Sequence, residues 1–519
     1  GSRQRRMPRS QWTDGDRVPQ FRPDMRAAIS ASAAANGLHS AAALALVAAA
    51  ALLVFLPTLD NGFLVAAFDD QLLLDDPHVR QLDPASLWAL MTSFRHANYV
   101  PLTMLTFALQ YPLSGVDPAP YHLVNVLLHA ATAVALWWFI RPLVGARWVA
   151  TVAALIFALH PIQLEAVSLV IQRKTLLSGL FVLLALIAYQ HWCQRRRWPA
   201  YALSLLAFVA AAAAKPTAVT LPLVLLLYDA VFVGGRMRLV EKAPFFAIAA
   251  AFAWAATAAS QAVGAIFPPH SGTWLGHLLI VARATMDGGV AILLPIALSP
   301  IYYYRAGTQF ELLNVAALAA LGLLAGLVML RRRQYPWAFF CAGWFVLMLL
   351  PQSNLLPLAQ LRPDRYVYLS MAGFAVAVAV GLRHLADILP TRPPWRVAIP
   401  ALGVLYAALL GAVTMHSVGV WRDDVTAWQR VVERNRWSAT AHMMLGEVYE
   451  ARDNTAAAER LYLEATRVQP LVAAPYLHLA RLYARNGAPL RAAQAARQYL
   501  ERAPDSPQRA SLARLAQHD

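Results

Sequence analysis

Residues 38–56 read LHSAAALALVAAAALLVFL, and this stretch decides the fold class of the chain. The run contains no Asp, Glu, Lys or Arg, and about 20 such residues suffice to cross the hydrocarbon core of a bilayer as a helix. It is too long for a signal-peptide core, and no small-residue cleavage site follows it. Hydrophobic residues make up 59% of the chain and charged residues only 14%. We therefore expect an all-α, polytopic membrane helix bundle that begins with this span.

Ten further apolar runs of comparable length predict eleven spans in total. They cover residues 122–140, 148–160, 175–192, 199–214, 217–233, 244–264, 311–330, 336–350, 367–388 and 397–416. Arg and Lys mark every second loop, and the positive-inside rule assigns these loops to the cytoplasm together with the basic tail of residues 1–36. Residues 276–300 are also apolar but contain Arg283 and Asp287, so we expect them to form a re-entrant or outer-surface segment.

The runs divide the chain into a membrane domain at 37–419 and a C-terminal domain at 420–519. Residues 60–120 form a loop that is far longer than a connector and should lie outside, in the periplasm of a bacterium. We expect short helices within it at 84–94 and 102–110. Long loops on a rigid scaffold usually carry function, so this loop is the first place to look for a site.

The formal net charge of +16 would suit a nucleic-acid-binding protein. The basic residues instead sit in short loops between apolar runs, where the positive-inside rule accounts for them. We therefore expect no nucleic-acid partner. The chain also lacks a glycine-rich nucleotide loop, which argues against an enzyme that uses ATP or a nucleotide sugar.

The C-terminal domain repeats with a period of 34 residues. The matching pairs are Leu445 with Leu479, Gly446 with Ala480, Tyr449 with Tyr483, Ala458 with Ala492, Tyr462 with Ala496 and Pro470 with Pro504. Small residues at the second and fourth pairs permit close helix packing, and the pattern predicts a tetratricopeptide α-solenoid. Such a module is either a platform for an acceptor peptide or a stabilising lid.

An acidic cluster follows the first span, with Asp69 and Asp70 close to Asp75 and Asp76. Carboxylates at a membrane exit cost free energy unless they face water, a cation or a substrate. They are also a residue type that removes a proton from a hydroxyl nucleophile. Asp69 and Asp70 are therefore the candidate catalytic residues. Four aspartates also leave a divalent cation open as a cofactor, and we expect no other.

Several cations stand at predicted outward ends of spans, where the positive-inside rule disfavours them. They are Arg173, Lys174, Lys215, Arg362 and Arg365. They either form ion pairs with the aspartates of the first loop or bind an anion, because arginine forks and lysine ammonium groups suit phosphate oxygens. An anion beside an apolar surface suggests a lipid-linked phosphate, whose departure needs electrostatic stabilisation more than a proton.

Further side chains at the same end are candidates for positioning the substrate. His160 stands close to Glu165 in the turn after the third span, and Tyr99 lies in the first loop. His122 shares a helix face with His129, seven residues on, so the two either bind a metal or form hydrogen bonds within the bundle. We assign His122 to substrate positioning and predict no metal site there.

Short motifs follow one another along the chain: FDD at 68–70, YVPLT at 99–103, YHLVN at 121–125, QRK at 172–174, RYVYL at 365–369 and WRDD at 421–424. Their order resembles that of the transmembrane-and-tetratricopeptide (TMTC-like) O-mannosyltransferases. The resemblance implies a type C glycosyltransferase (GT-C) fold and inverting sugar transfer from a polyprenyl-phosphate donor. It also implies that an acid of the first loop is the base and that Arg173, Lys174 and Arg365 hold the lipid phosphate.

The leading hypothesis is a membrane enzyme that transfers a mannose-like hexose to Ser/Thr hydroxyls of secreted proteins. The alternatives are transfer to a glycolipid or polysaccharide, and a non-catalytic flippase or assembly scaffold. The Ala- and Arg-rich composition indicates a bacterial inner membrane, with the C-terminal repeats in the periplasm. The expected partners are the polyprenyl-phosphate sugar, membrane lipid, and an acceptor protein or peptide bound through the repeats.

Overall fold

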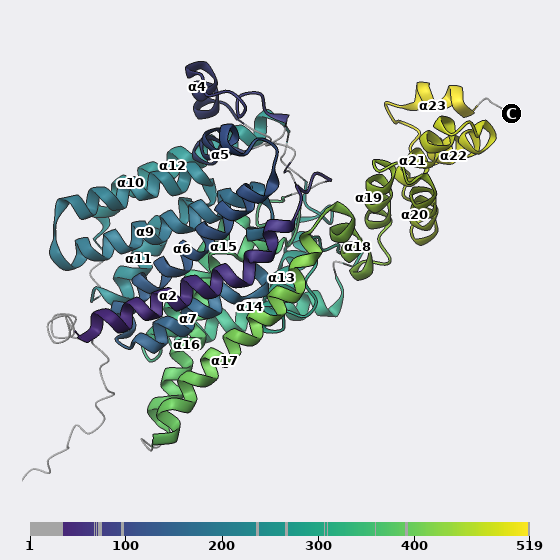
Figure 1. Ribbon diagram of the computed structural model, residues 1–519. Helices are drawn as coiled ribbons and strands as arrows, with labels where there is room; N and C mark the ends of the chain where they lie inside the picture. The colour runs from purple at the N-terminus through teal and green to yellow at the C-terminus, as the bar shows by residue number, and fades with distance from the viewer. Residues whose placement is uncertain are drawn as a thin grey trace, which may run out of the picture.

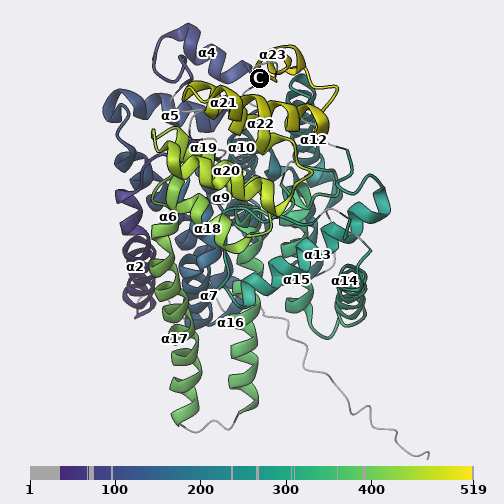
Figure 2. The ribbon, with the colours of Figure 1, turned by 90° about the vertical axis from the view of Figure 1, so that its right-hand side faces the viewer.

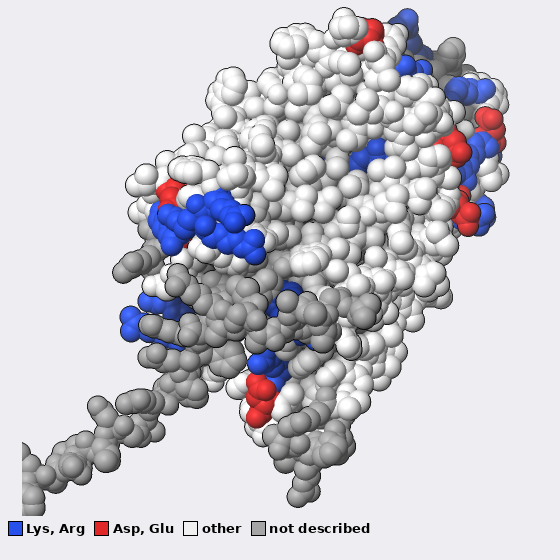
Figure 3. Space-filling view, turned by 60° about the vertical axis from the view of Figure 1, so that its left-hand side comes forward, with Lys and Arg blue, Asp and Glu red and all other residues white. Residues whose placement is uncertain are grey.

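The computed structural model describes residues 35–516, apart from residues 67, 69, 71–74, 95–97, 235–237, 265–267, 306, 309, 359 and 390–392. Within this part the regular elements are helices, which confirms the all-α fold class (Figure 1). Most of them run side by side in one large bundle, and a smaller group of helices projects from its end. Figure 3 shows a broad uncharged surface on the bundle, with most Lys and Arg side chains towards its ends, as contact with hydrocarbon requires.

A helix covers each of the apolar runs that were expected to span the membrane. These helices are α2 (Ala35–Phe55), α6 (Pro118–Val144), α7 (Arg147–Leu159), α9 (Arg173–Arg195), α10 (Trp198–Ala214), α11 (Leu221–Phe232), α12 (Leu239–Ala262), α14 (Leu312–Leu330), α15 (Pro336–Leu349), α16 (Ser370–Ile388) and α17 (Pro393–Ser417). Among the described residues, 8 helices are long and apolar enough to cross a membrane by themselves, or 9 if α7 and the helices after its 51° bend count as one span. The chain is thus a multi-pass membrane protein by helix length and composition, and the total of eleven spans stays a prediction.

One further helix, α13 (Trp274–Leu293), covers the segment that was expected to be re-entrant. It continues through Gly288 and Gly289 without a break, and it is also long and apolar enough to count as a span. Figure 2 shows it running obliquely to α16 and α17. A stretch without helix, Leu294–Arg305, follows it and leads towards the site described below. A re-entrant course in the membrane remains a prediction.

The core of the bundle is formed around α7, which packs against α2, α6, α16 and α17. Two glycines allow this close packing. A Cβ added at Gly403 of α17 would meet Val152 of α7 at 2.7 Å, and one at Gly373 of α16 would meet the Cys341 carbonyl of α15 at 2.7 Å. Small residues let helix backbones approach closely, which matters in a bilayer because the hydrophobic effect does not drive helices together there.

Short elements cluster at one end of the bundle, where the helices break. They are α4 (Pro84–Thr92), α5 (Pro101–Ser114), η2 (Pro161–Gln163), α8 (Leu164–Ser168), η3 (Val170–Gln172), η4 (Pro216–Thr220) and η6 (Asp364–Val367). The first two confirm the helices expected within the long loop. The predicted site residues fall largely on these turns.

The C-terminal domain consists of helix pairs (Figure 2). Its helices are α18 (Asp424–Arg434), α19 (Ala439–Glu450), α20 (Thr455–Val468), α21 (Ala474–Arg485), α22 (Pro489–Arg502) and α23 (Arg509–Ala516). The pair α21–α22 repeats the lengths of α19–α20, with 12 and 14 residues each. A Cβ at Gly446 would lie 2.5 Å from the Tyr462 ring, so the expected close packing is present. The tetratricopeptide assignment itself stays a prediction.

The apolar core of the membrane domain continues across the expected domain boundary near residue 420. Trp421 and Trp428 are 4% and 1% exposed, and they belong to the same apolar core as the membrane helices. A separate apolar cluster begins only with Ala458. The helices α18 and α19 therefore share the apolar core of the membrane domain, while the helices from α20 onward form their own core.

Candidate active site

The acidic loop after α2 is tied to the segment that precedes α9. The Asp70 side chain is fully buried. Its Oδ2 accepts a hydrogen bond from the Leu64 N–H at 3.0 Å, and its Oδ1 accepts one from the Ile171 N–H at 2.8 Å. This carboxylate therefore orients the loop against η3. Asp69, the other predicted catalytic carboxylate, lies outside the described residues.

Helix α18 holds the same loop from the C-terminal side. The N–H groups of Val65 and Ala66 each donate to the Asp424 carboxylate at 3.1 Å, and the Trp428 indole N–H donates to the Ala66 carbonyl at 3.0 Å. The Phe68 ring packs on Trp428 with a centroid distance of 5.8 Å. The acidic loop is thus clamped between two elements that are more than 200 residues apart in the sequence.

Three of the predicted cations, Lys174, Lys215 and Arg365, lie near enough to one another to interact, and Arg365 is paired with Glu165. The Arg365 backbone N–H donates to Glu165 Oε2 at 2.8 Å, and its guanidinium forms an ion pair with the same side chain. Burial lowers the pKa of Lys215 well below its ordinary value, the charges of Lys174 and Arg365 lower this pKa further, and Glu165 raises it. Lysine and arginine side chains gathered in this way are suited to binding an anion.

Lys215 is held in place by two neutral acceptors. Its Nζ donates to Thr175 Oγ1 at 3.0 Å and to Gln352 Oε1 at 2.9 Å. Lys215, Arg365 and these two partners line a small cavity of about 30 Å³, which suffices for ordered water. Thr175 lies four residues after Ile171, so one short segment joins the carboxylate that orients the loop to the cation cluster.

Arg173 lies beneath this segment and is 1% exposed. Its guanidinium donates to Asn125 Oδ1 and to the Tyr121 carbonyl, both at 3.3 Å, and it lies 4.3 Å from the centroid of the Phe107 ring. None of these partners is charged, and within the described residues Arg173 forms no ion pair. It therefore adds uncompensated positive charge next to the first turn of α9.

Arg362 belongs to a different cluster. Its guanidinium stacks on the Tyr302 ring at 4.0 Å and lies 3.6 Å from Asp364 Oδ1. The Tyr302 hydroxyl donates to Asp364 Oδ2 at 3.0 Å. Burial raises the pKa of Asp364 to about 7, although the Arg362 charge opposes this effect. The prediction that Arg362 shares an anion with the other cations is not supported by these contacts.

A cavity of about 470 Å³ lies between the two clusters. Its walls come from η2 and α8, the stretch 295–300, the end of α17, residues 420–421 and Arg430 of α18, and they include Glu165 and Asp364. Asp364 Oδ1 faces this region without a hydrogen-bond partner among the described residues. Trp421 also packs against Phe68 at 5.9 Å, so one residue of the cavity wall contacts the acidic loop.

Comparison with known proteins points to one group of relatives. The chain is 26% identical over 433 residues, 75% of its length, to protein O-mannosyl-transferase TMTC3 of Mus musculus. This chain is a homologue of the TMTC protein O-mannosyl-transferases. It is also 33% identical over 224 residues, 41% of the chain, to Tmtc1 of Drosophila melanogaster, and 44% identical over 107 residues, 21% of the chain, to tmtc2 of Xenopus laevis.

The matched segments span 46%, 25% and 13% of these three relatives, so the chain corresponds to less than half of each. No protein-family model matches the chain. No solved structure matches it either. The comparisons therefore confirm the TMTC resemblance, and the site of this TMTC homologue has to be argued from its own residues.

The residues predicted to position substrate are spread over the site and its surroundings. His160 bonds the Ile292 carbonyl at 2.9 Å and the Ile162 N–H at 3.1 Å rather than Glu165, so it orders the break after α7. His122 contacts the Gly62 carbonyl at 3.4 Å, at the start of the acidic loop. Tyr99 donates to the Met91 carbonyl at 2.9 Å and packs near Phe252 of α12. The structure therefore brings His122 to the site and leaves Tyr99 in the outer loop.

Within the described part of this TMTC homologue, no group of three or more His, Cys, Asp or Glu side chains could hold a metal ion. Asp69 is not among those residues, so a divalent cation stays a prediction.

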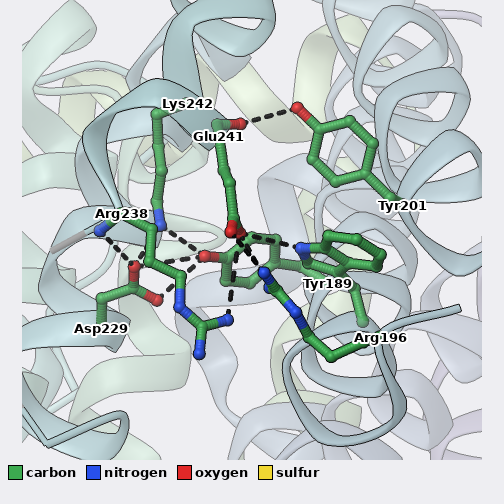
Figure 4. Close-up of polar contacts among 8 residues, drawn as sticks. Tyr189, Arg196, Tyr201, Asp229, Arg238, Glu241 and Lys242 are labelled. Carbon is green, nitrogen blue, oxygen red and sulfur yellow. Dashed lines mark hydrogen bonds and ion pairs between the residues drawn. The ribbon is translucent and has the colours of Figure 1, made fainter. Parts of the chain in front are cut away.

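Sequence reasoning missed two polar groupings. Asp424 and Trp428 received no role, although the WRDD motif contains the first of them. A buried network at the opposite end of the bundle joins Lys242 to Asp229 and to the Tyr189 hydroxyl (Figure 4). Its signal in the sequence is an aspartate inside the apolar run 217–233, which requires a partner when buried.

Proposed function

We propose that this chain is a membrane glycosyltransferase that moves a mannose-like hexose from a polyprenyl-phosphate donor to Ser/Thr hydroxyls of proteins. The observation that carries the proposal is the segment Ile171–Thr175. One end of it binds Asp70 of the acidic loop, and the other end binds Lys215 of the cation cluster. A base and a phosphate site are the two parts that such a transfer needs. The names of the TMTC relatives support the reaction class.

The two adjacent aspartates, Asp69 and Asp70, have different roles in this proposal. Both Asp70 oxygens accept backbone hydrogen bonds, so Asp70 orients the loop. We assign proton removal to Asp69. The acceptor hydroxyl gives its proton to this carboxylate while its oxygen attacks the anomeric carbon. The bond from that carbon to the phosphate oxygen breaks, and its electron pair leaves with the phosphate. Attack opposite the leaving group inverts the anomeric configuration.

The cations stabilise the departing phosphate. Lys174, Lys215 and Arg365 interact electrostatically, and Arg365 is paired with Glu165, so a phosphodiester that binds here meets several positive charges. The phosphate leaves as a stabilised anion and needs no proton from an acid. The polyprenyl chain then extends into the surrounding hydrocarbon.

The cavity between Glu165, Asp364 and Trp421 suits the acceptor. It borders α18, the first helix of the C-terminal domain, so a peptide held by the repeats enters from that side. We place the protein in a bacterial inner membrane, with the acidic loop and the repeats on the periplasmic face. Basic loops at the opposite ends of the spans support this orientation.

The test measures transfer of labelled hexose from a polyprenyl-phosphate donor to acceptor protein by the purified chain. Asp69→Asn should lower the rate about 100-fold or more, the usual contribution of a general base. Asp70→Asn should lower the rate together with the melting temperature, because an amide cannot accept two N–H groups equally well. Asp75→Asn is the matched control, because Asp75 is exposed in the same loop, and it should leave the rate unchanged.

Full activity of Asp69→Asn would refute the assignment of the base to Asp69, and full activity of Asp70→Asn as well would refute any role for the acidic pair. Mass spectrometry identifies the product. Hexose found only on glycolipid would favour the glycolipid alternative, and absence of any transfer by the folded wild-type protein would favour a flippase or scaffold.

A further inference from the structure

A second feature lies at the far end of α9 from the candidate active site. A groove of about 690 Å³ runs between α9 and α10. Its walls are apolar over most of their length and include Leu184, Leu203 and Leu206, which are 39%, 59% and 67% exposed. At one end the walls become basic and consist of His191, Arg195 and Arg197.

The groove is remote from the chemistry proposed above. Arg173 begins α9 and Arg195 ends it, and 23 residues at 1.5 Å each separate the two ends by roughly 33 Å. This is about the thickness of the hydrocarbon core of a bilayer. A group held by Arg195 and Arg197 at the basic end of the groove therefore lies at the opposite end of α9 from the acidic loop.

The three consecutive arginines at this end have different roles. Arg196 stacks on Trp192 at 4.3 Å and forms an ion pair with Glu241 of α12 at 2.8 Å (Figure 4). Its charge is already compensated within the protein. Arg195 and Arg197 line the mouth of the groove and form no ion pair within the described residues. Two uncompensated guanidinium groups thus stand beside an apolar channel.

This combination fits one chemical class of ligand. The apolar channel accepts an acyl chain, and the guanidinium pair accepts a phosphate at the depth of the lipid headgroups. Trp198, 70% exposed at the start of α10, marks the same depth, because tryptophan prefers the interface between membrane and water. A free phosphate would leave the channel unused, and a neutral lipid would leave the arginines uncompensated.

We propose that the α9–α10 groove binds an anionic glycerophospholipid, with one acyl chain between the helices and its phosphate between Arg195 and Arg197. The bound lipid bridges α9 and α10 at the end remote from the active site and stabilises their packing. The proposal is independent of the transferase activity.

The experiment uses the full chain, purified in detergent and stripped of lipid. Native mass spectrometry and the melting temperature are followed while dioleoyl phosphatidylglycerol or dioleoyl phosphatidylcholine is added. Phosphatidylglycerol should give a one-lipid adduct and raise the melting temperature, and phosphatidylcholine should do so at least about tenfold less effectively. Each basic residue near a membrane surface contributes about fivefold to the affinity for an anionic lipid.

The double variant Arg195→Gln/Arg197→Gln should lose the preference for phosphatidylglycerol. Arg196→Gln is the matched control, because it removes an equal charge from the same turn, and it should keep the preference. Arg195→Lys/Arg197→Lys keeps the charges and should keep most of the binding, which separates loss of charge from loss of fold. Ala210→Phe narrows the channel and should weaken the adduct without any change in charge.

Equal binding of the two lipids, or an unchanged preference in the double glutamine variant, would overturn the proposal. So would displacement of phosphatidylglycerol by glycerol phosphate at equal concentration, because the acyl chain would then contribute nothing. Tighter binding of a polyprenyl phosphate than of phosphatidylglycerol in the same groove would likewise refute it.

Discussion

Replacing Asp424 by asparagine should slow sugar transfer about tenfold. The Asp424 carboxylate accepts the N–H groups of Val65 and Ala66, each at 3.1 Å. Hydrogen bonds to a charged group contribute about 1.5–3 kcal/mol each. Both N–H groups donate to Oδ1, and the Val65 N–H also lies 3.3 Å from Oδ2, so an amide can keep neutral hydrogen bonds at one oxygen but loses the negative charge. Asp424 is also partly exposed, so we take the lower end of the range, about 1.5 kcal/mol. If this energy holds the acidic loop in its reactive position, the rate falls by about a factor of ten.

Asp423 provides the matched control. It precedes Asp424, caps α18 by accepting the Thr426 N–H at 2.9 Å, and forms no hydrogen bond with the described residues of the loop. Asp423→Ala should lower the free energy of unfolding by about 1 kcal/mol, a loss similar to that in Asp424→Asn. The assay combines the rate of hexose transfer with the melting temperature of each variant.

The two variants should therefore lose similar stability but differ in rate. Trp428→Phe gives an independent check, because it removes the hydrogen bond to the Ala66 carbonyl and keeps an aromatic ring beside Phe68. It should slow transfer several-fold. If Asp423→Ala and Asp424→Asn slow transfer equally, or if Asp424→Asn is as active as the wild type, α18 does not position the loop.

Three further predictions follow from charge and packing. Burial raises the pKa of Asp364 from 3.8 to about 7, so between these pH values the folded state holds a proton that the unfolded chain releases. The free energy of unfolding should therefore fall by up to about 4 kcal/mol as the pH rises from 3.8 to 7. Asp364→Asn should make the melting temperature less dependent on pH over this range. Burial and nearby cations lower the pKa of Lys215, and an anion binds the protonated form of this side chain. The KM for the donor should therefore rise with pH. Lys215→Met should raise this KM and abolish its pH dependence. Gly446→Val would clash with the Tyr462 ring and should lower the melting temperature by an amount that corresponds to about 1–3 kcal/mol of stability. The control Gly381→Ala places its methyl group where no atom lies within 4 Å, so it should leave the melting temperature unchanged. Equal melting temperatures of the two variants would contradict close packing of Gly446 against Tyr462.

Much of the fold could be predicted because the bilayer imposes a local rule. A backbone in hydrocarbon has to satisfy its own hydrogen bonds, so each long apolar run becomes a helix wherever it lies in the chain. The repeat period likewise predicted helix pairs with Gly446 at a close contact. The course of 276–300 was harder to predict, because glycines that break an isolated helix are tolerated in α13 when neighbouring helices cover it.

The candidate site was only partly predictable. Lys174, Lys215 and Arg365 were selected because the sequence predicts them at outward ends of spans, and the structure brings them near one another, with Arg365 paired to Glu165. Arg362 is also predicted to lie at the outward end of a span, but its guanidinium stacks on Tyr302 instead. The direction in which a side chain leaves a turn depends on the packing of the whole bundle, and no short stretch of sequence contains that information.

The sequence by itself determined that this protein is a helical membrane protein, and it placed an acidic loop after the first span and cations at the ends of later spans. These features follow from composition, charge and spacing, which are properties of neighbouring residues. Only the tertiary structure decided that Asp70 is buried against Ile171 and that Asp424 holds the other side of the same loop. The same is true of the contrast between Arg196, which is paired, and its two neighbours. Burial and pairing join residues that are far apart in the chain, so they arise only when the helices pack.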